Sequence, residues 1–108
     1  MTAESCKFAM AEGDELLTLN QRAEDVSSLL KTLAHAERLK ALCMLAQGEL
    51  PVATLQAMSA LSQSALSQHL AILRKADIIE MRKEAQCVFY RIKDTRIFAL
   101  LAALETCI

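Results

Sequence analysis

Cysteine and histidine side chains are the groups of this 108-residue chain that could bind a metal ion or act as nucleophiles. The histidines are His35 and His69, which belong to different predicted elements. The four cysteines are widely separated and form no C-x-x-C pair, so neither a zinc ribbon nor a thioredoxin motif is available. In a reducing compartment we expect all four to be free thiols. They are Cys6, Cys43, Cys87 and Cys107.

The stretch SQSALSQHLAILRK, residues 62–75, indicates a second kind of chemistry, which is hydrogen bonding to a partner. Leu66, Leu70 and Leu73 recur at helical spacing and predict a buried stripe. The first eleven residues contain no Asp, Glu, Lys or Arg, whereas a solvated helix usually carries Glu/Lys pairs four residues apart. The polar side of this helix is therefore predicted to face something other than water.

The composition predicts one small domain with a local basic patch. Hydrophobic residues make up 54% of the chain and charged residues only 23%, which is apolar for a soluble monomer and favours a buried dimer interface. Residues 1–28 carry six acidic and two basic side chains, whereas residues 62–93 carry six basic and three acidic ones. A formal net charge of −1 thus hides a basic segment, which is typical of a small nucleic-acid binder.

The sequence shows no sign of secretion or membrane insertion. The N-terminus lacks a basic start followed by an apolar run, and no uninterrupted apolar stretch approaches the ~18 residues that a membrane span requires. We therefore expect a cytoplasmic protein with no membrane partner.

Helical periodicity predicts four helices before a hairpin and one helix after it. Residues 1–15 are expected to form a mobile N-terminal segment and residues 16–108 a single DNA-binding and dimerisation domain. The helices are predicted up to about residue 34, at 36–46, in a short stretch that begins at Pro51, after the N-cap Ser62, and at 94–106. Alternating apolar residues on both sides of RKEAQ predict the hairpin, with a loose loop because this tip lacks Gly, Asn and Asp.

This order, α-α-α-α-β-β-α in a mainly α chain with a minor β component, predicts a winged helix-turn-helix. In that fold the second helix of the pair enters the major groove of DNA, where short polar side chains reach base edges and basic ones reach phosphates. The alternative interpretation is that the polar face of the helix only contacts water and that the hairpin has a purely structural role. The predicted DNA contacts are Gln63, Ser64, Ser67, Gln68 and His69 on the helix, Arg74 and Lys75 near phosphates, and Arg82, Lys83 and Gln86 on the wing.

Three segments, LLKTLAHAERLKALCML, LSQSALSQHLAILRKADII and RKEAQCVFYRI, resemble the ArsR/SmtB family of dimeric bacterial transcription factors over about residues 26–108. The family usually has a proline where this chain has Ala36, which leaves the expected fold unchanged. The resemblance implies a winged-helix homodimer, joined through its first and last helices, that binds promoter DNA and is usually a repressor until an inducer binds.

The resemblance also limits which classes of inducer this chain is expected to bind. The family's arsenic sensors carry Cys-Val-Cys in the third helix, where this chain has Pro51 and Ala53, and its zinc sensors place His and Asp on the last helix, which here has no His. No metal site and no cofactor is therefore expected. The positions of Cys43 and Cys107 are similar to those of the sensor cysteines in the persulfide-responsive HlyU/BigR-type branch, which implies a sulfane sulfur inducer.

Several alternatives stay open at this stage. Peroxide, in place of a persulfide, could oxidise the same two thiols to a disulfide. A repressor that senses a metal ion is less favoured. The protein could also activate transcription rather than repress it. Cys6 and Cys87 are interpreted as bystanders, although Cys6 could assist. A helical protein-interaction module would explain the apolar last helix but not the basic wing. An enzyme is not expected, because the chain has only two glycines and no H-E-x-x-H motif.

Overall fold

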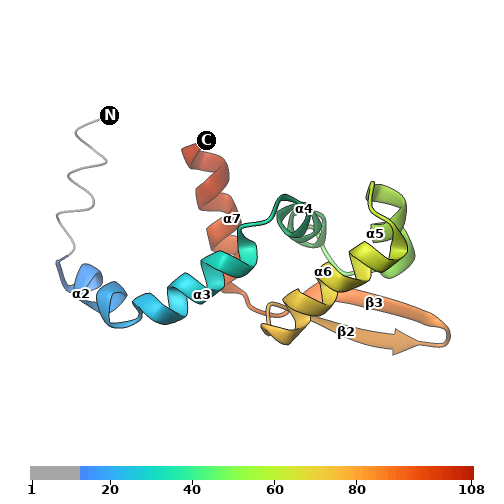
Figure 1. Ribbon diagram of the computed structural model, residues 1–108, viewed down its shortest axis with the longest axis horizontal. Coiled ribbons are helices and arrows are strands. Elements are labelled where there is room, and N and C mark those ends of the chain that lie inside the picture. The colour runs from blue at the N-terminus through green and yellow to red at the C-terminus, as the bar shows by residue number, and fades with distance from the viewer. Residues whose placement is uncertain (1–12) are drawn as a thin grey trace. The chain divides into compact units, whose positions relative to one another are not determined.

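The computed structural model describes residues 13–108, with side chains from Leu17 onward (Figure 1). The chain divides into two compact units, of which the first ends at Lys31 and the second spans Thr32–Ile108. Residues 13–15, predicted to belong to a mobile segment, form the start of a helix, and the remainder of that segment lies outside the described residues.

The first predicted helix is divided into two, α2 (Gly13–Gln21) and α3 (Ala23–Leu33). The interruption is confined to Arg22, whose N–H still bonds to the carbonyl of Thr18 and whose carbonyl accepts from Val26. Among the described side chains of this segment only that of Leu33 is buried, at 4% exposed, whereas Leu30 is 51% exposed.

The next helix, α4 (Ala36–Leu45), confirms the prediction for 36–46. His35 caps its N-terminus, because the ring nitrogen Nδ1 accepts from the N–H of Glu37 at 3.2 Å. The helix ends at Ala46, and Gly48 follows with φ 144°, a conformation that L side chains rarely adopt. This glycine turns the chain toward the sheet.

Helices α5 (Val52–Met58) and α6 (Gln63–Lys75) form the predicted helix-turn-helix. Ser62 is the N-cap of α6 as predicted, since its hydroxyl accepts from the N–H of Ala65 at 3.1 Å. The side chain of Gln56 donates to the carbonyl of Leu61 at 2.7 Å and so closes the turn between the helices. Pro51, predicted to be the first helical residue of α5, is instead its N-cap.

Strands β1 (Leu50–Pro51), β2 (Ile79–Glu84) and β3 (Cys87–Ile92) form an antiparallel sheet in the order β1-β3-β2. The hairpin β2–β3 was predicted, whereas β1 was not, because two residues that include a proline carry no strand pattern. Leu50 pairs with Tyr90 and Pro51 with Phe89. The connection between α4 and α5 is thereby joined to the wing.

The hairpin tip is tighter than the sequence predicted. Glu84 pairs with Cys87, so only Ala85 and Gln86 form the turn. Ala85 takes the positive φ of 57° that such a turn demands, a conformation that glycine or asparagine usually supplies. The expectation of a loose loop was wrong because pairing along the whole length of both strands stabilises a turn that its own residues disfavour.

The core of the second unit lies between α4, α5, α6 and the sheet. Leu66, Leu70 and Leu73, the predicted stripe of α6, are 3%, 1% and 0% exposed. The side chains of Leu42 and Leu55 are fully buried. Among the described residues no polar or charged side chain is buried, so apolar burial holds α6 in place and leaves its opposite side free.

The last helix, α7 (Arg96–Cys107), confirms the prediction for 94–106 within its ends. Asp94 precedes it, and the Arg96 side chain beside this carboxyl lowers the pKa of Asp94. Ile97 anchors α7 in the core, whereas Phe98 is 43% and Leu104 is 39% exposed. Much of the apolar surface of α7 is therefore uncovered in a single chain.

Candidate functional site

The exposed side of α6 carries four polar side chains opposite the buried leucines. Gln63, Ser64, Ser67 and Gln68 are all exposed, as the sequence predicted. Within residues 13–108 none of these side chains hydrogen bonds to another part of the chain. Their donors and acceptors are therefore available to an external partner with the hydrogen-bonding pattern of base edges.

The C-terminal end of α6 adds positive charge to this side. Arg74 and Lys75 are both exposed in its last turn. Arg74 reaches the sulfur of Met81 on β2 at 2.6 Å, a weak acceptor that does not neutralise the guanidinium. The structure thus places Arg74 between α6 and the hairpin and leaves Lys75 exposed at the end of the helix; phosphate contacts of both stay a prediction.

His69 differs from its neighbours on α6 because its ring turns toward α4. The ring centroids of His35 and His69 are 4.3 Å apart, and Nη1 of Arg38 lies 3.3 Å from Nδ1 of His69. Arg38 also donates to the carbonyl of Thr32 at 2.6 Å. The sequence predicted a DNA contact for His69, and the structure gives it contacts that tie α6 to the start of α4.

Burial lowers the pKa of His69, and the nearby His35 and Arg38 lower it further, while Glu37 opposes them. A histidine with a lowered pKa in the folded state binds fewer protons than in the unfolded state, where its pKa is about 6.5. This stabilisation of the folded state is fully present above that pH and is lost as the pH falls from there through the lower pKa of the folded state. We expect the free energy of unfolding to fall between pH 7.5 and pH 5.5 more steeply in the native protein than in His69→Gln, measured by chemical denaturation.

The glutamine of this variant keeps a polar side chain beside Arg38 but does not titrate in this range. Carboxylate titration contributes equally to both proteins, so the difference between the two slopes isolates His69. Parallel pH dependences in the two proteins would contradict the assignment.

The hairpin carries the three predicted wing residues, Arg82, Lys83 and Gln86, all of them exposed. Among the described residues Lys83 forms no ion pair. Arg82 is different, because it pairs with Glu49 at 2.7 Å and with Glu84 at 2.5 Å. Glu49 lies in the connection before β1 and was not singled out from the sequence.

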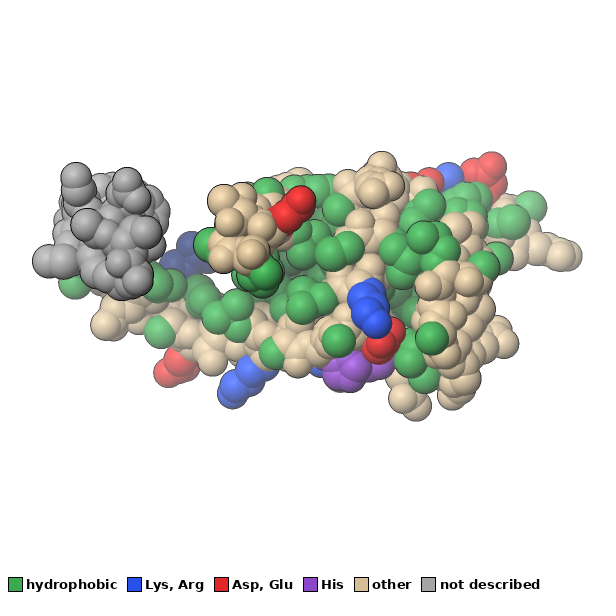
Figure 2. Space-filling view, turned by 90° about the horizontal axis from the view of Figure 1, so that it is seen from above, with side chains coloured by type: hydrophobic (Ala, Val, Ile, Leu, Met, Phe, Trp, Pro, Cys, Tyr) green, Lys and Arg blue, Asp and Glu red, His purple; other side chains and the backbone are tan. Residues whose placement is uncertain are grey.

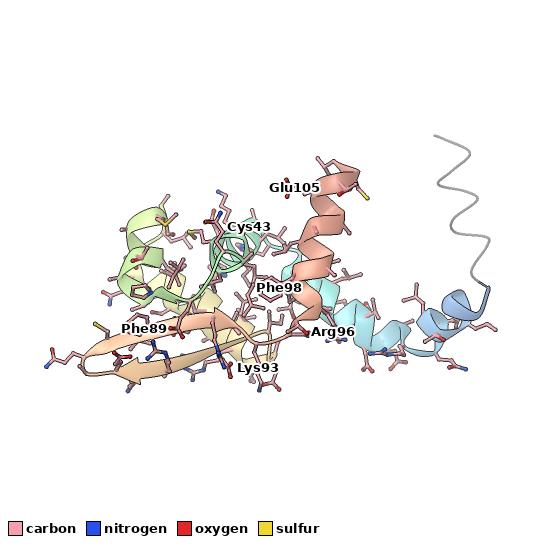
Figure 3. The ribbon with its side chains drawn as sticks, turned by 180° about the vertical axis from the view of Figure 1, so that it is seen from behind. Cys43, Phe89, Lys93, Arg96, Phe98 and Glu105 are labelled. Carbon is pink, nitrogen blue, oxygen red and sulfur yellow. The ribbon has the colours of Figure 1, made fainter. Side chains whose placement is uncertain are left out.

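The thiol of Cys43 is exposed and lies in a groove of about 770 Å³ between α4 and α7. Leu39 lines the groove from α4, and Phe98, Leu101 and Ile108 line it from α7 and its end. Figure 3 labels Cys43 on α4 and Phe98 near the start of α7, and both residues line this groove. The Cys43 side chain is accessible although that of Leu42 beside it on the helix is fully buried.

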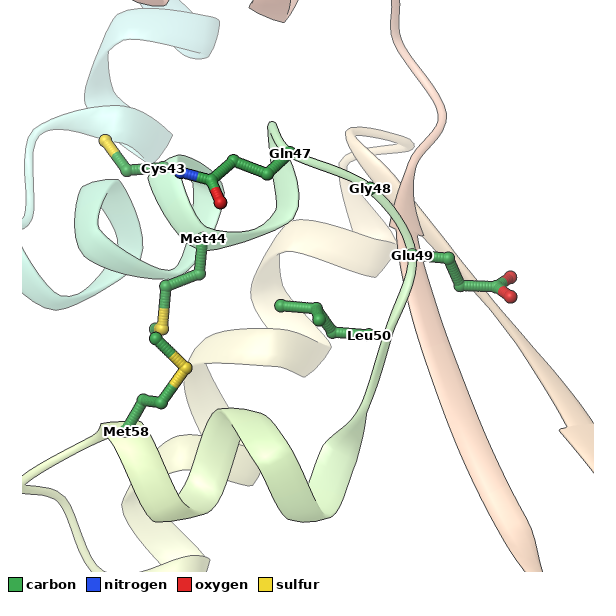
Figure 4. A pocket seen from close by; sticks show the side chains of 7 residues that line it. All are labelled: Cys43, Met44, Gln47, Gly48, Glu49, Leu50 and Met58. Carbon is green, nitrogen blue, oxygen red and sulfur yellow. The ribbon is translucent and has the colours of Figure 1, made fainter.

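A second, smaller cavity of about 450 Å³ also includes Cys43 in its wall. Figure 4 shows the side chains of Met44 and Met58 meeting across this cavity, while the Glu49 carboxylate points out of it toward the hairpin. Cys43 therefore lies at the junction of two cavities, one of which reaches the connection that carries Glu49.

Cys107 is the last residue of α7 and is exposed. It does not itself line the groove, although its neighbours Glu105 and Ile108 do. It lies nine positions after Phe98, which on a helix turns the two side chains to opposite sides. The structure thus brings the end of α7 to the groove but does not place both sulfurs in it. Cys87 is exposed on β3, and Cys6 lies outside the described residues.

A metal centre and a membrane span have no candidates in the described part of the chain. There, no group of three or more His, Cys, Asp or Glu side chains is arranged to hold a metal ion. Across residues 13–108 no helix has the length and apolar character needed to cross a bilayer.

Known proteins are similar to this chain in sequence and in fold. Residues 35–81 match the family described as bacterial regulatory protein, arsR family. The biofilm growth-associated repressor of Agrobacterium fabrum is 45% identical over 89 residues, which cover 82% of this chain and 76% of that protein. The transcriptional activator HlyU of Vibrio cholerae is 50% identical over 77 residues, 71% of each chain.

A similar solved structure is the transcriptional repressor BigR from Xylella fastidiosa. It superposes with a TM-score of 0.79 at 38% identity and covers 83% of this chain and 92% of that one.

Proposed function

The chain belongs to the ArsR family of bacterial regulatory proteins and is a DNA-binding transcriptional regulator, and from this premise we propose that sulfane sulfur switches its promoter binding through Cys43 and Cys107. The observation that carries the proposal is the position of Cys43, an exposed thiol in an apolar groove against the helix that ends in Cys107.

In the proposed DNA complex α6 lies in the major groove and the hairpin follows the adjacent backbone. The leucine stripe fixes the helix rigidly, so the freely exposed Gln63, Ser64, Ser67 and Gln68 are presented to base edges without a cost of ordering the scaffold. Arg74 and Lys75 at its C-terminal end supply charge for phosphates. His69 contributes by holding α6 against α4.

We propose that two chains assemble through the first and last helices. The exposed apolar side chains of the first unit, Leu17, Leu19 and Leu30, and those of α7 support this assembly. Figure 2 shows hydrophobic side chains gathered on the face viewed from above. A homodimer would cover such surfaces and present two copies of α6 to a palindromic site.

The sulfur chemistry proceeds by thiol exchange. The Cys43 thiolate attacks the outer sulfur of a small persulfide RSSH, which leaves a persulfide on Cys43 and releases the thiol RSH. Cys107 reacts with a second RSSH in the same way. The terminal sulfur of one protein persulfide then attacks the inner sulfur of the other, a trisulfide bridge forms, and HS⁻ leaves with its proton as H₂S.

The bridge requires only a local rearrangement of α7. Cys107 occupies the last helical position, and helix ends fray readily, while its neighbours already lie in the groove with Cys43. A link between α4 and α7 changes how the α6 and wing regions of two chains are spaced. Since each phosphate contact depends on that spacing, a small shift removes several contacts together.

Intact-mass spectrometry after treatment with a small persulfide tests the proposal. We expect one added sulfur atom with the loss of two hydrogen atoms, together with weaker binding to a duplex selected by the protein from a random-sequence pool.

Peroxide is the second candidate, since it would oxidise the exposed Cys43 to a sulfenic acid that Cys107 converts to a disulfide with loss of water. That route removes two hydrogen atoms and adds no sulfur. Unchanged duplex binding after both treatments would contradict either mechanism.

A further inference from the structure

The guanidinium of Arg82 on the wing pairs with two carboxylates. Its Nε and Nη2 donate to the two oxygens of Glu49 at 2.9 and 2.7 Å, and its Nη1 donates to Glu84 at 2.5 Å. The carbon between these nitrogens lies 4.5 Å from the ring centre of Phe89. All three guanidinium nitrogens are therefore engaged within the chain.

The pair with Glu49 spans the sheet. Glu49 directly precedes β1, Arg82 belongs to β2, and β3, which carries Phe89, lies between them. The two charged residues are 33 positions apart in the chain and meet only because β1 and β2 both pair with β3. We call this contact the Glu49–Arg82 clasp.

The clasp persists at neutral pH but remains open to competing ions. Its hydrogen bonds with Arg82 lower the pKa of Glu49, and the carboxylates raise the pKa of Arg82. The side chains of Arg82 and Glu49 are 48% and 29% exposed, so a phosphate can reach the guanidinium only by competing with carboxylates already in place.

We propose that Glu49 sets the DNA affinity of this regulator by holding Arg82 away from the phosphate backbone. Arg82, Glu49 and Glu84 together carry one net negative charge, which repels a phosphate group. The neighbouring Lys83 has no carboxylate partner among the described residues and serves as the wing cation for phosphate. The inference concerns DNA affinity alone and does not depend on the sulfur chemistry.

The salt dependence of binding by Glu49→Gln tests this inference. Each phosphate contact contributes a slope of about −0.9 to a plot of log affinity against log salt. We expect binding to the selected duplex to tighten about two- to fivefold at low salt, because an exposed ion pair is a weak competitor. The slope should steepen by about 0.9 per chain, since the released Arg82 gains one phosphate.

Two further variants separate release of Arg82 from a general change in charge. Glu37→Gln also neutralises a paired carboxylate, which binds Lys40 on α4 at 3.3 Å, and should leave the slope unchanged. The double variant Glu49→Gln, Arg82→Gln has the net charge of the native chain and should return to the native slope. An unchanged or shallower slope for Glu49→Gln, or an equal change in Glu37→Gln, would overturn the proposal. Circular dichroism checks that each variant is folded.

Discussion

Replacing Gln68 with glutamate is expected to weaken binding to the selected duplex by about 100-fold. Gln68 is exposed on α6, and its side chain bonds to no other described residue, so the exchange leaves the packing of the helix intact. The new carboxylate loses the amide donor and brings a negative charge toward phosphates and base acceptors. Fluorescence anisotropy with a labelled duplex measures the loss.

The matched control is Gln21→Glu, which makes the same chemical change at an exposed position of α2. It alters the net charge equally and should shift the affinity far less. If both variants lost affinity to the same extent, the effect would be one of overall charge. If Gln68→Glu bound as the native protein does, α6 would not be the helix that reads DNA.

Replacing Cys43 with serine is expected to abolish the response to persulfide. The native protein should lose about 5- to 150-fold in DNA affinity on treatment, which is the usual range of allosteric coupling. The serine variant should lose none, because a hydroxyl does not undergo thiol exchange. Cys43 is exposed, so the substitution leaves the apolar core untouched.

Two other serine variants distinguish formation of the persulfide on Cys43 from formation of the bridge to Cys107. Cys107→Ser should form a persulfide on Cys43 without a bridge, so its mass should rise by one sulfur atom with no loss of hydrogen, and it should not show the full loss of binding. Cys87→Ser removes an exposed thiol from β3 and should respond as the native protein does. A full response in Cys43→Ser would rule out Cys43 as the reactive thiol.

Local patterns in the sequence predicted the elements that position the site. The leucine spacing of α6 and the cap at Ser62 depend on residues at most a few positions apart, and both are confirmed. Fold class followed from the order of such elements. The interruption at Arg22 was not predicted, because an apolar pattern runs across it without a proline or glycine.

Contacts between residues far apart in the chain could not be predicted from the sequence. The ring contact of His35 with His69 and the Glu49–Arg82 clasp join residues more than 30 positions apart, and nothing in their local surroundings marks them as partners. The short strand β1 was missed for the same reason, since its two residues become a strand only by pairing with β3. The exposure of Cys43 depends likewise on where α7 packs.

The compact tip at Ala85 and Gln86 fixes how far the hairpin extends from the body of the protein. Every residue from Ile79 to Glu84 pairs with one residue of β3, so one residue inserted in β2 ahead of Arg82 and paired in register would turn Arg82 and Lys83 to the opposite faces of the sheet. The hairpin can therefore be lengthened without turning its charged side chains only when residues are added in pairs, one on each strand.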